Sequence, residues 1–131
     1  MVTSTPQSAK AKGRKFQQQL REDLIRELGI SPDNILSTAM GQGGCDLYLS
    51  PAARSVFPFG VEAKRCETLA IPAWWKQCEC NASKVGLIPL LVFKRNREEP
   101  LAVLRWSDLL ALLQQDHRWE NLAEGLTGGR P

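Results

Sequence analysis

The sequence predicts a single α/β domain in which helices flank a mixed β-sheet. Three patterns support this class: apolar residues at helical spacing near the amino terminus, two alternating apolar and polar segments in the middle, and a continuously apolar run after residue 86. The expected order is helix, two or three strands, helix, strand, strand and helix. With 131 residues, of which 43% are hydrophobic and 24% charged, the chain can build one hydrophobic core.

The first helix is expected from about Gly13 to Leu28, because apolar residues recur there every four positions and Gly29 suits the end of a helix. The apolar positions are Phe16, Leu20, Leu24 and Leu28. Gln17 falls beside this stripe, so its side chain should point toward the body of the protein. Residues 1–12 are expected to form a flexible basic arm.

The remaining elements follow from turn residues and periodicity. The expected order after the first helix is a turn at 31–34, a short strand at 35–40, a Gly-rich loop at 41–44, a strand at 45–50, a turn at 51–55 and a strand at about 57–64. The order beyond it is a helix from Pro72 to near Gly86, a strand at 87–93, a basic turn, a strand at 101–105 and a helix at 108–115. Residues 119–131 are expected to be frayed, so the folded domain should span 13–118.

Two of these strands place charge on one face. Alternation from residue 45 puts Asp46 opposite the apolar side chains of Leu47 and Leu49. Alternation in the next strand leaves Glu62 and Lys64 together on the face opposite its apolar residues. If the two strands are neighbours, two carboxylates and one ammonium converge. The alternative is an ordinary ion pair on a solvated sheet face.

Converging carboxylates would suit a hard divalent cation that keeps part of its hydration shell, which indicates Mg²⁺, with Mn²⁺ as a substitute. Asp46 and Glu62 would be the ligands, and the backbone carbonyl of Ala63 could be a third. Lys64 could orient the attacking water or stabilise a phosphorane-like transition state. The four cysteines fit no usual zinc spacing and are expected to be reduced, mostly buried side chains.

The net charge of +3 conceals an uneven distribution. Residues 1–21 contain five basic residues and no acid, and a second basic cluster, Lys94, Arg95 and Arg97, falls in an expected turn. Such clusters suit a phosphate backbone, although a solubilising tail and a charged turn would look the same. No apolar run reaches membrane-spanning length and no hydrophobic signal is present, so a cytoplasmic protein without membrane contact is expected.

Four short motifs resemble the PD-(D/E)xK nuclease superfamily, and within it the archaeal and phage Holliday junction resolvases. They are KGRKF at Lys12–Phe16, GQGGCD at Gly41–Asp46, VEAK at Val61–Lys64 and WKQ at Trp75–Gln77. The resemblance covers roughly Lys12 to Arg105. It implies a restriction-endonuclease-like fold with an αβββαβ core, in which Asp46, Glu62 and Lys64 are catalytic and Gln77 supports them.

The same resemblance implies a Mg²⁺-dependent homodimer that cuts four-way DNA junctions in recombination or repair. Such a protein would act in the cytoplasm, in the host cytoplasm if it is phage-encoded, or at the nucleoid. The expected DNA-binding residues are Lys10, Lys12, Arg14, Lys15, Arg65 and Lys84. Gln17 departs from the pattern, since it stands where the family has a glutamate, and it is expected to support the active site. The alternatives are another superfamily nuclease, of restriction or end-processing type, and a catalytically silent DNA-binding protein on the same fold.

Overall fold

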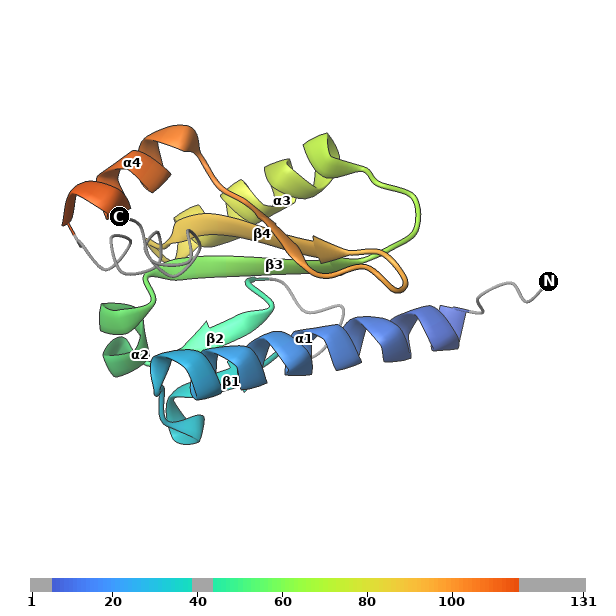
Figure 1. The fold of residues 1–131 in the computed structure, drawn as a ribbon, viewed down its shortest axis with the longest axis horizontal. Coiled ribbons are helices and arrows are strands. Elements are labelled where there is room, and N and C mark those ends of the chain that lie inside the picture. Colours follow the sequence, from blue (N-terminus) through green and yellow to red (C-terminus); the bar gives the residue numbers. More distant parts are fainter. Residues whose placement is uncertain (1–5, 39–43, 116–131) are drawn as a thin grey trace, which may run out of the picture.

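The computed structural model describes residues 6–38 and 44–115 (Figure 1). In chain order the elements are α1 (Pro6–Leu28), a 3-10 turn (Pro32–Asn34), β1 (Ile35–Ser37), β2 (Leu47–Leu49), α2 (Pro51–Val56), β3 (Phe59–Arg65), α3 (Ile71–Lys84), β4 (Ile88–Lys94), β5 (Leu101–Val103) and α4 (Trp106–Gln115). The mixed α/β class expected from the sequence is confirmed. No helix within these described residues is long and apolar enough to cross a membrane.

The strands form two small sheets that meet beside Asp46. β1 and β2 pair antiparallel, while β3 pairs with β4 in parallel and β4 with β5 antiparallel. The backbone N–H of Asp46, just before β2, donates a 2.9 Å hydrogen bond to the carbonyl of Val61 in β3. This bond brings Asp46 next to β3, the strand that carries Glu62 and Lys64.

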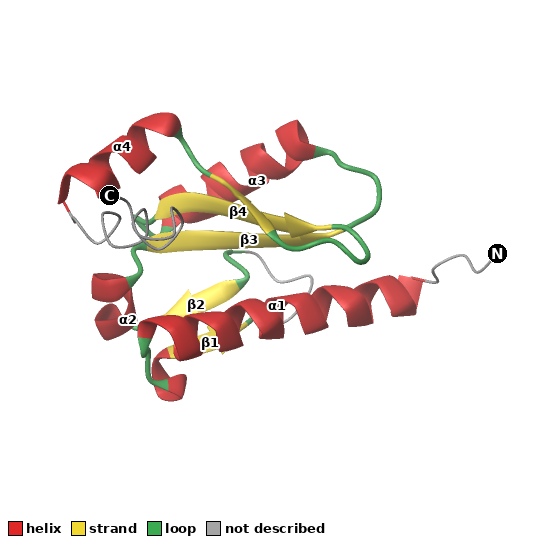
Figure 2. Ribbon diagram, viewed as in Figure 1, coloured by secondary structure: helices red, strands yellow, loops and turns green. Residues whose placement is uncertain are grey.

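Helices cover both faces of β3. On one face Val61 packs in a cluster with Phe16 and Leu20 of α1. On the other face α3 approaches so closely that a Cβ at Gly60 would lie 2.8 Å from the Cβ of Ala82. Figure 2 shows α1 running along β1, and α3 beside β3 and β4; α1 also contacts β3. The face of β3 that carries Glu62 is therefore covered by a helix and is not a solvated surface.

The first helix is longer than the sequence pattern predicted, since α1 begins at Pro6 and not near Gly13. Proline suits the first turn of a helix, and the alanines and lysines that follow favour helix formation. Lys10 and Lys12, expected in a flexible arm, therefore lie on α1. Residues 1–5 of that arm, most of the Gly-rich loop and the carboxyl-terminal segment expected to be frayed lie outside the described residues.

Two smaller differences concern α2 and α4. The segment after Ser50, expected to be a turn, is the short helix α2, because the Ser50 hydroxyl accepts a 3.2 Å hydrogen bond from the N–H of Ala53 and caps it. The last helix begins at Trp106, two residues before its expected start at Asp108.

Candidate active site

Asp46 is fixed beside β3 by its backbone and by its carboxylate. Its carbonyl accepts a 2.9 Å bond from the N–H of Thr38, and its Oδ2 accepts a 2.7 Å bond from the N–H of Ala63. The second bond crosses from the start of β2 to the residue that follows Glu62. The two carboxylates expected to converge are therefore held on adjacent segments.

Glu62 is a buried charge with an unused acceptor. Its side chain is only 3% exposed, and its Oε1 lies 3.7 Å from Nζ of Lys64, which is 28% exposed. Its Oε2 is buried and has no hydrogen-bond partner among the residues that the structure describes. Buried polar atoms are normally satisfied, so this oxygen marks a place where a binding partner is expected.

The electrostatics show what kind of partner the site favours. Burial, and then the nearby Asp46, raise the pKa of Glu62 to about 7, against weaker opposing effects of Lys64 and the side-chain amide of Asn81. Burial also raises the pKa of Asp46, although the Ala63 N–H and Lys64 oppose the shift. One ammonium therefore does not compensate the buried Glu62 and the half-buried Asp46, and an additional cation would stabilise both carboxylates in their ionised forms.

Helix α3 covers Glu62, and the motif predicted that Gln77 on this helix supports the active site. Gln77 is exposed to solvent. Asn81, one turn later and only partly exposed, lies close enough to Glu62 to lower its pKa by hydrogen bonding. Both residues lie on the polar edge of α3, and the sequence signal for Asn81 was its i, i+4 spacing from Gln77.

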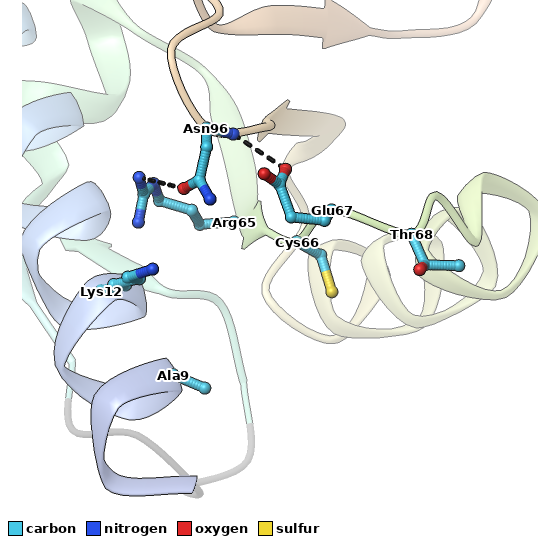
Figure 3. A pocket seen from close by; sticks show the side chains of 7 residues that line it. All are labelled: Ala9, Lys12, Arg65, Cys66, Glu67, Thr68 and Asn96. Atoms are coloured by element: carbon cyan, nitrogen blue, oxygen red, sulfur yellow. Dashed lines mark hydrogen bonds between the residues drawn. The ribbon is translucent and has the colours of Figure 1, made fainter. Parts of the chain in front are cut away.

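The expected DNA-binding residues separate into two groups. Lys12, Lys15 and Arg65 line connected hollows at the carboxyl end of β3 (Figure 3 shows Lys12 and Arg65). Lys94 and Arg97 line parts of the same hollows. Lys10 and Arg14 are exposed on α1, and Lys84 is exposed at the end of α3; these three are not among the residues that line the hollows.

Comparison with known protein families decides the affiliation. A family described as "Phage putative PDDEXK endonuclease" matches residues 8–124, which is most of the chain. The chain belongs to this family. Membership places it in the PD-(D/E)xK nuclease superfamily, supports nuclease activity, and agrees with a small restriction-endonuclease-like fold for the two sheets and four helices described. No curated protein and no solved structure shows a significant match.

Nucleases of this superfamily generally use divalent metals, and the oxygens of this endonuclease suit a small hard cation. Two carboxylates face one region, and Oε2 of Glu62 is available as a ligand. Within the described part of the chain no three His, Cys, Asp or Glu residues form a metal-binding group. Carbonyl and water oxygens would therefore have to complete the coordination of a bound cation.

Two thiols, those of Cys45 and Cys78, border the site. Cys78 is buried with its Sγ 3.7 Å from the carbonyl of Gly60, and burial raises its thiol pKa to about 12. Burial and the nearby carboxylates also raise the pKa of Cys45. Both shifts favour the thiol form, and it is the thiolate that binds metals, so the carboxylates are the more suitable ligands for a cation.

Gln17 is buried, as its position beside the apolar stripe predicted. It is 2% exposed, and its Oε1 accepts a 2.8 Å hydrogen bond from the hydroxyl of Ser37 in β1. Ser37 pairs with Leu47, the residue after Asp46. Gln17 therefore ties α1 to the strand pair that follows Asp46, and it contributes no charge.

Proposed function

We propose that this chain is a Mg²⁺-dependent endodeoxyribonuclease that cleaves branched DNA, with Asp46 and Glu62 as metal ligands and Lys64 as the catalytic cation. The observation that carries the proposal is the unpartnered, buried Oε2 of Glu62 beside a second carboxylate and a lysine. A structural ion pair would not need that second carboxylate, and burying it without a function would cost stability.

The chain's own residues have distinct roles in this reaction. A bound Mg²⁺ or Mn²⁺ would lower the pKa of a water ligand and offset negative charge on the phosphodiester. Asp46 is preorganised for binding because the Ala63 N–H fixes its Oδ2. We assign the Ala63 carbonyl as a further ligand. Lys64, which reaches from Glu62 toward solvent, donates to the attacking water or to the phosphoryl oxygens as charge develops on them.

The branched substrate is inferred from the motifs at Lys12–Phe16, Gly41–Asp46, Val61–Lys64 and Trp75–Gln77, whose order and spacing resemble those of Holliday junction resolvases. A four-way junction presents two symmetric strands, so we propose a homodimer that cuts both. Action on phage or host DNA would place the protein in the host cytoplasm.

The deciding experiment compares a labelled synthetic four-way junction with linear duplex of the same sequence. Wild type and Glu62→Ala are assayed with Mg²⁺, with Mn²⁺ and with chelator. Paired, symmetric nicks on the junction alone, lost with chelator and in the variant, support the proposal. Equal cleavage of linear duplex would replace it with a general PD-(D/E)xK nuclease.

A silent DNA-binding protein is the second candidate, and the neutral, hydrogen-bonded Gln17 is the observation that favours it. Tight junction binding without cleavage in either metal would support this candidate. The variant Gln17→Glu then becomes informative, since it returns the family's carboxylate to the same buried position. Gain of metal-dependent cleavage in that variant would locate the lost chemistry at residue 17.

A further inference from the structure

Five basic side chains converge at the carboxyl end of β3. They come from α1 (Lys12 and Lys15), from β3 (Arg65), from the end of β4 (Lys94) and from the β4–β5 turn (Arg97). Three connected hollows, of about 240, 330 and 550 Å³, share Lys12 and Arg65 in their walls. We call this region the β3-end pocket. In Figure 3, Lys12, Arg65 and Asn96 approach the same space from three different elements.

The described residues do not neutralise the positive charge of this pocket. Among those that line it, Glu67 is the one carboxylate, and its Oε2 accepts a 2.9 Å hydrogen bond from the backbone N–H of Asn96. Among the described residues, no ion pair involves any of the five cations. Like charges around these adjoining hollows repel one another, so a bound anion would stabilise the arrangement.

The pocket is built by specific contacts and is not a chance gathering of surface lysines. Nη2 of Arg65 donates a 2.7 Å hydrogen bond to Oδ1 of Asn96, which holds the β4–β5 turn against the end of β3. Arg97 follows with a φ of 62°, a left-handed conformation that is uncommon for a residue other than glycine. The turn thus presents Arg97 from a backbone conformation that carries a steric cost.

The pocket and the carboxylates lie on opposite faces of one strand. Glu62 faces α3, whereas Arg65 falls with Val61 and Ala63 on the face covered by α1. Arg65 follows Glu62 by three residue steps of extended strand, a distance of about 10 Å along the strand. That length matches the axial rise of about three nucleotides in one DNA strand.

We infer that the β3-end pocket binds a backbone phosphate of the same nucleic-acid strand that is cleaved at Asp46 and Glu62. The strand would cross the carboxyl end of β3 from the α3 side to the α1 side. Ammonium and guanidinium groups are suited donors to phosphate oxygens, and such contacts set the register of a strand without reading its sequence. The inference rests on the proposed nuclease function and adds where the strand runs.

The test compares two kinds of charge removal. The double variant Lys12→Gln/Arg97→Gln removes two pocket cations. The control, Arg26→Gln, removes an exposed cation of α1 that pairs with Asp23 and Glu27 and does not line the pocket. DNA binding is measured by fluorescence anisotropy with chelator, at several salt concentrations. The double variant should bind about tenfold more weakly, with a salt slope lower by roughly two, and the control should bind like wild type.

A second measurement separates a backbone phosphate from free phosphate. Inorganic phosphate is titrated into wild type and the double variant while the backbone amide of Asn96 is followed by NMR. A shift at Asn96 in wild type that is lost in the double variant, together with weakened DNA binding, supports the inference. A phosphate shift with unchanged DNA binding overturns it, because the pocket would then take only the free anion.

The outcomes also separate this inference from the proposed function. If wild type cleaves DNA and the double variant binds and cleaves equally well, the inference fails and the nuclease stands. If wild type cleaves nothing in either metal, but the double variant binds DNA about tenfold more weakly, the nuclease proposal fails and the binding path stands.

Discussion

The two polar regions of β3 are built in opposite ways. Glu62 is buried under α3, with one carboxylate oxygen unsatisfied, whereas Arg65 lies at an open pocket where it is hydrogen-bonded to Asn96. The burial of Glu62 destabilises its ionised form, whereas the cations around Arg65 are open to solvent. This difference fits the two roles proposed above for the seven residues of β3: metal-assisted hydrolysis at Glu62, and phosphate binding at the open pocket beside Arg65.

The largest effect should come from the buried region. Glu62→Ala should reduce kcat for DNA cleavage by about a thousandfold, because it removes a metal ligand, while DNA binding in chelator stays the same or tightens. Steady-state cleavage and anisotropy measure the two quantities. Glu27→Ala, an exposed carboxylate at the far end of α1, is the control. A Glu62→Ala protein that retained a tenth of the activity would contradict the assignment.

The pH dependence of stability should report the same burial. Because the pKa of Glu62 is raised from 4.5 to about 7, the folded state holds its proton more tightly than the unfolded state does. The metal-free protein should therefore lose stability as pH rises from about 4.5 to 7, by on the order of 3 kcal/mol.

Urea unfolding at pH 5, 6 and 7.5 with chelator measures this slope. Glu62→Gln should flatten this slope, and any contribution from Asp46 has the same sign, because its pKa is also raised. Mg²⁺ should restore stability to wild type at pH 7.5. A wild-type protein that became more stable over this pH range would mean that Glu62 is not buried as described.

Lys64 should contribute less than the metal ligands. Lys64→Gln keeps a hydrogen-bond donor but removes the charge, so kcat should fall by about a hundredfold with little change in KM. Isothermal titration with Mn²⁺ provides the matched readout, since metal affinity should persist in this variant and be lost in Glu62→Ala. Loss of Mn²⁺ binding in Lys64→Gln would assign Lys64 a structural role.

The smallest change in cleavage rate is expected at α3, where Asn81 and Gln77 should differ. Asn81→Ala should lower the rate about tenfold and raise the pH at which Glu62 ionises, because Asn81 favours the carboxylate form. Gln77→Ala should remain near wild type if the exposure of Gln77 persists when DNA is bound. The pH–rate profile of each variant measures both expectations. The reverse ranking would show that substrate brings Gln77 into the site.

The sequence alone determined the mixed α/β class, the strand around Glu62 and the faces of its side chains, because alternation along a strand is a local property. It also indicated the relation of Asp46, Glu62 and Lys64 to a nuclease motif. The family match confirms the superfamily. The strand and the faces of its side chains follow from chain neighbours, whereas the nuclease relation follows from the order and spacing of short motifs.

Tertiary structure decided what covers each face. Alternation along β3 could not distinguish a solvated face from one buried under α3. The burial of Glu62 depends on the close approach of Gly60 to Ala82, two residues that are far apart in the sequence. Likewise, Lys12 meets Arg65 and Arg97 only because α1 and the β4–β5 turn pack at the same end of β3. Such proximities arise from packing between distant segments, which no local period encodes.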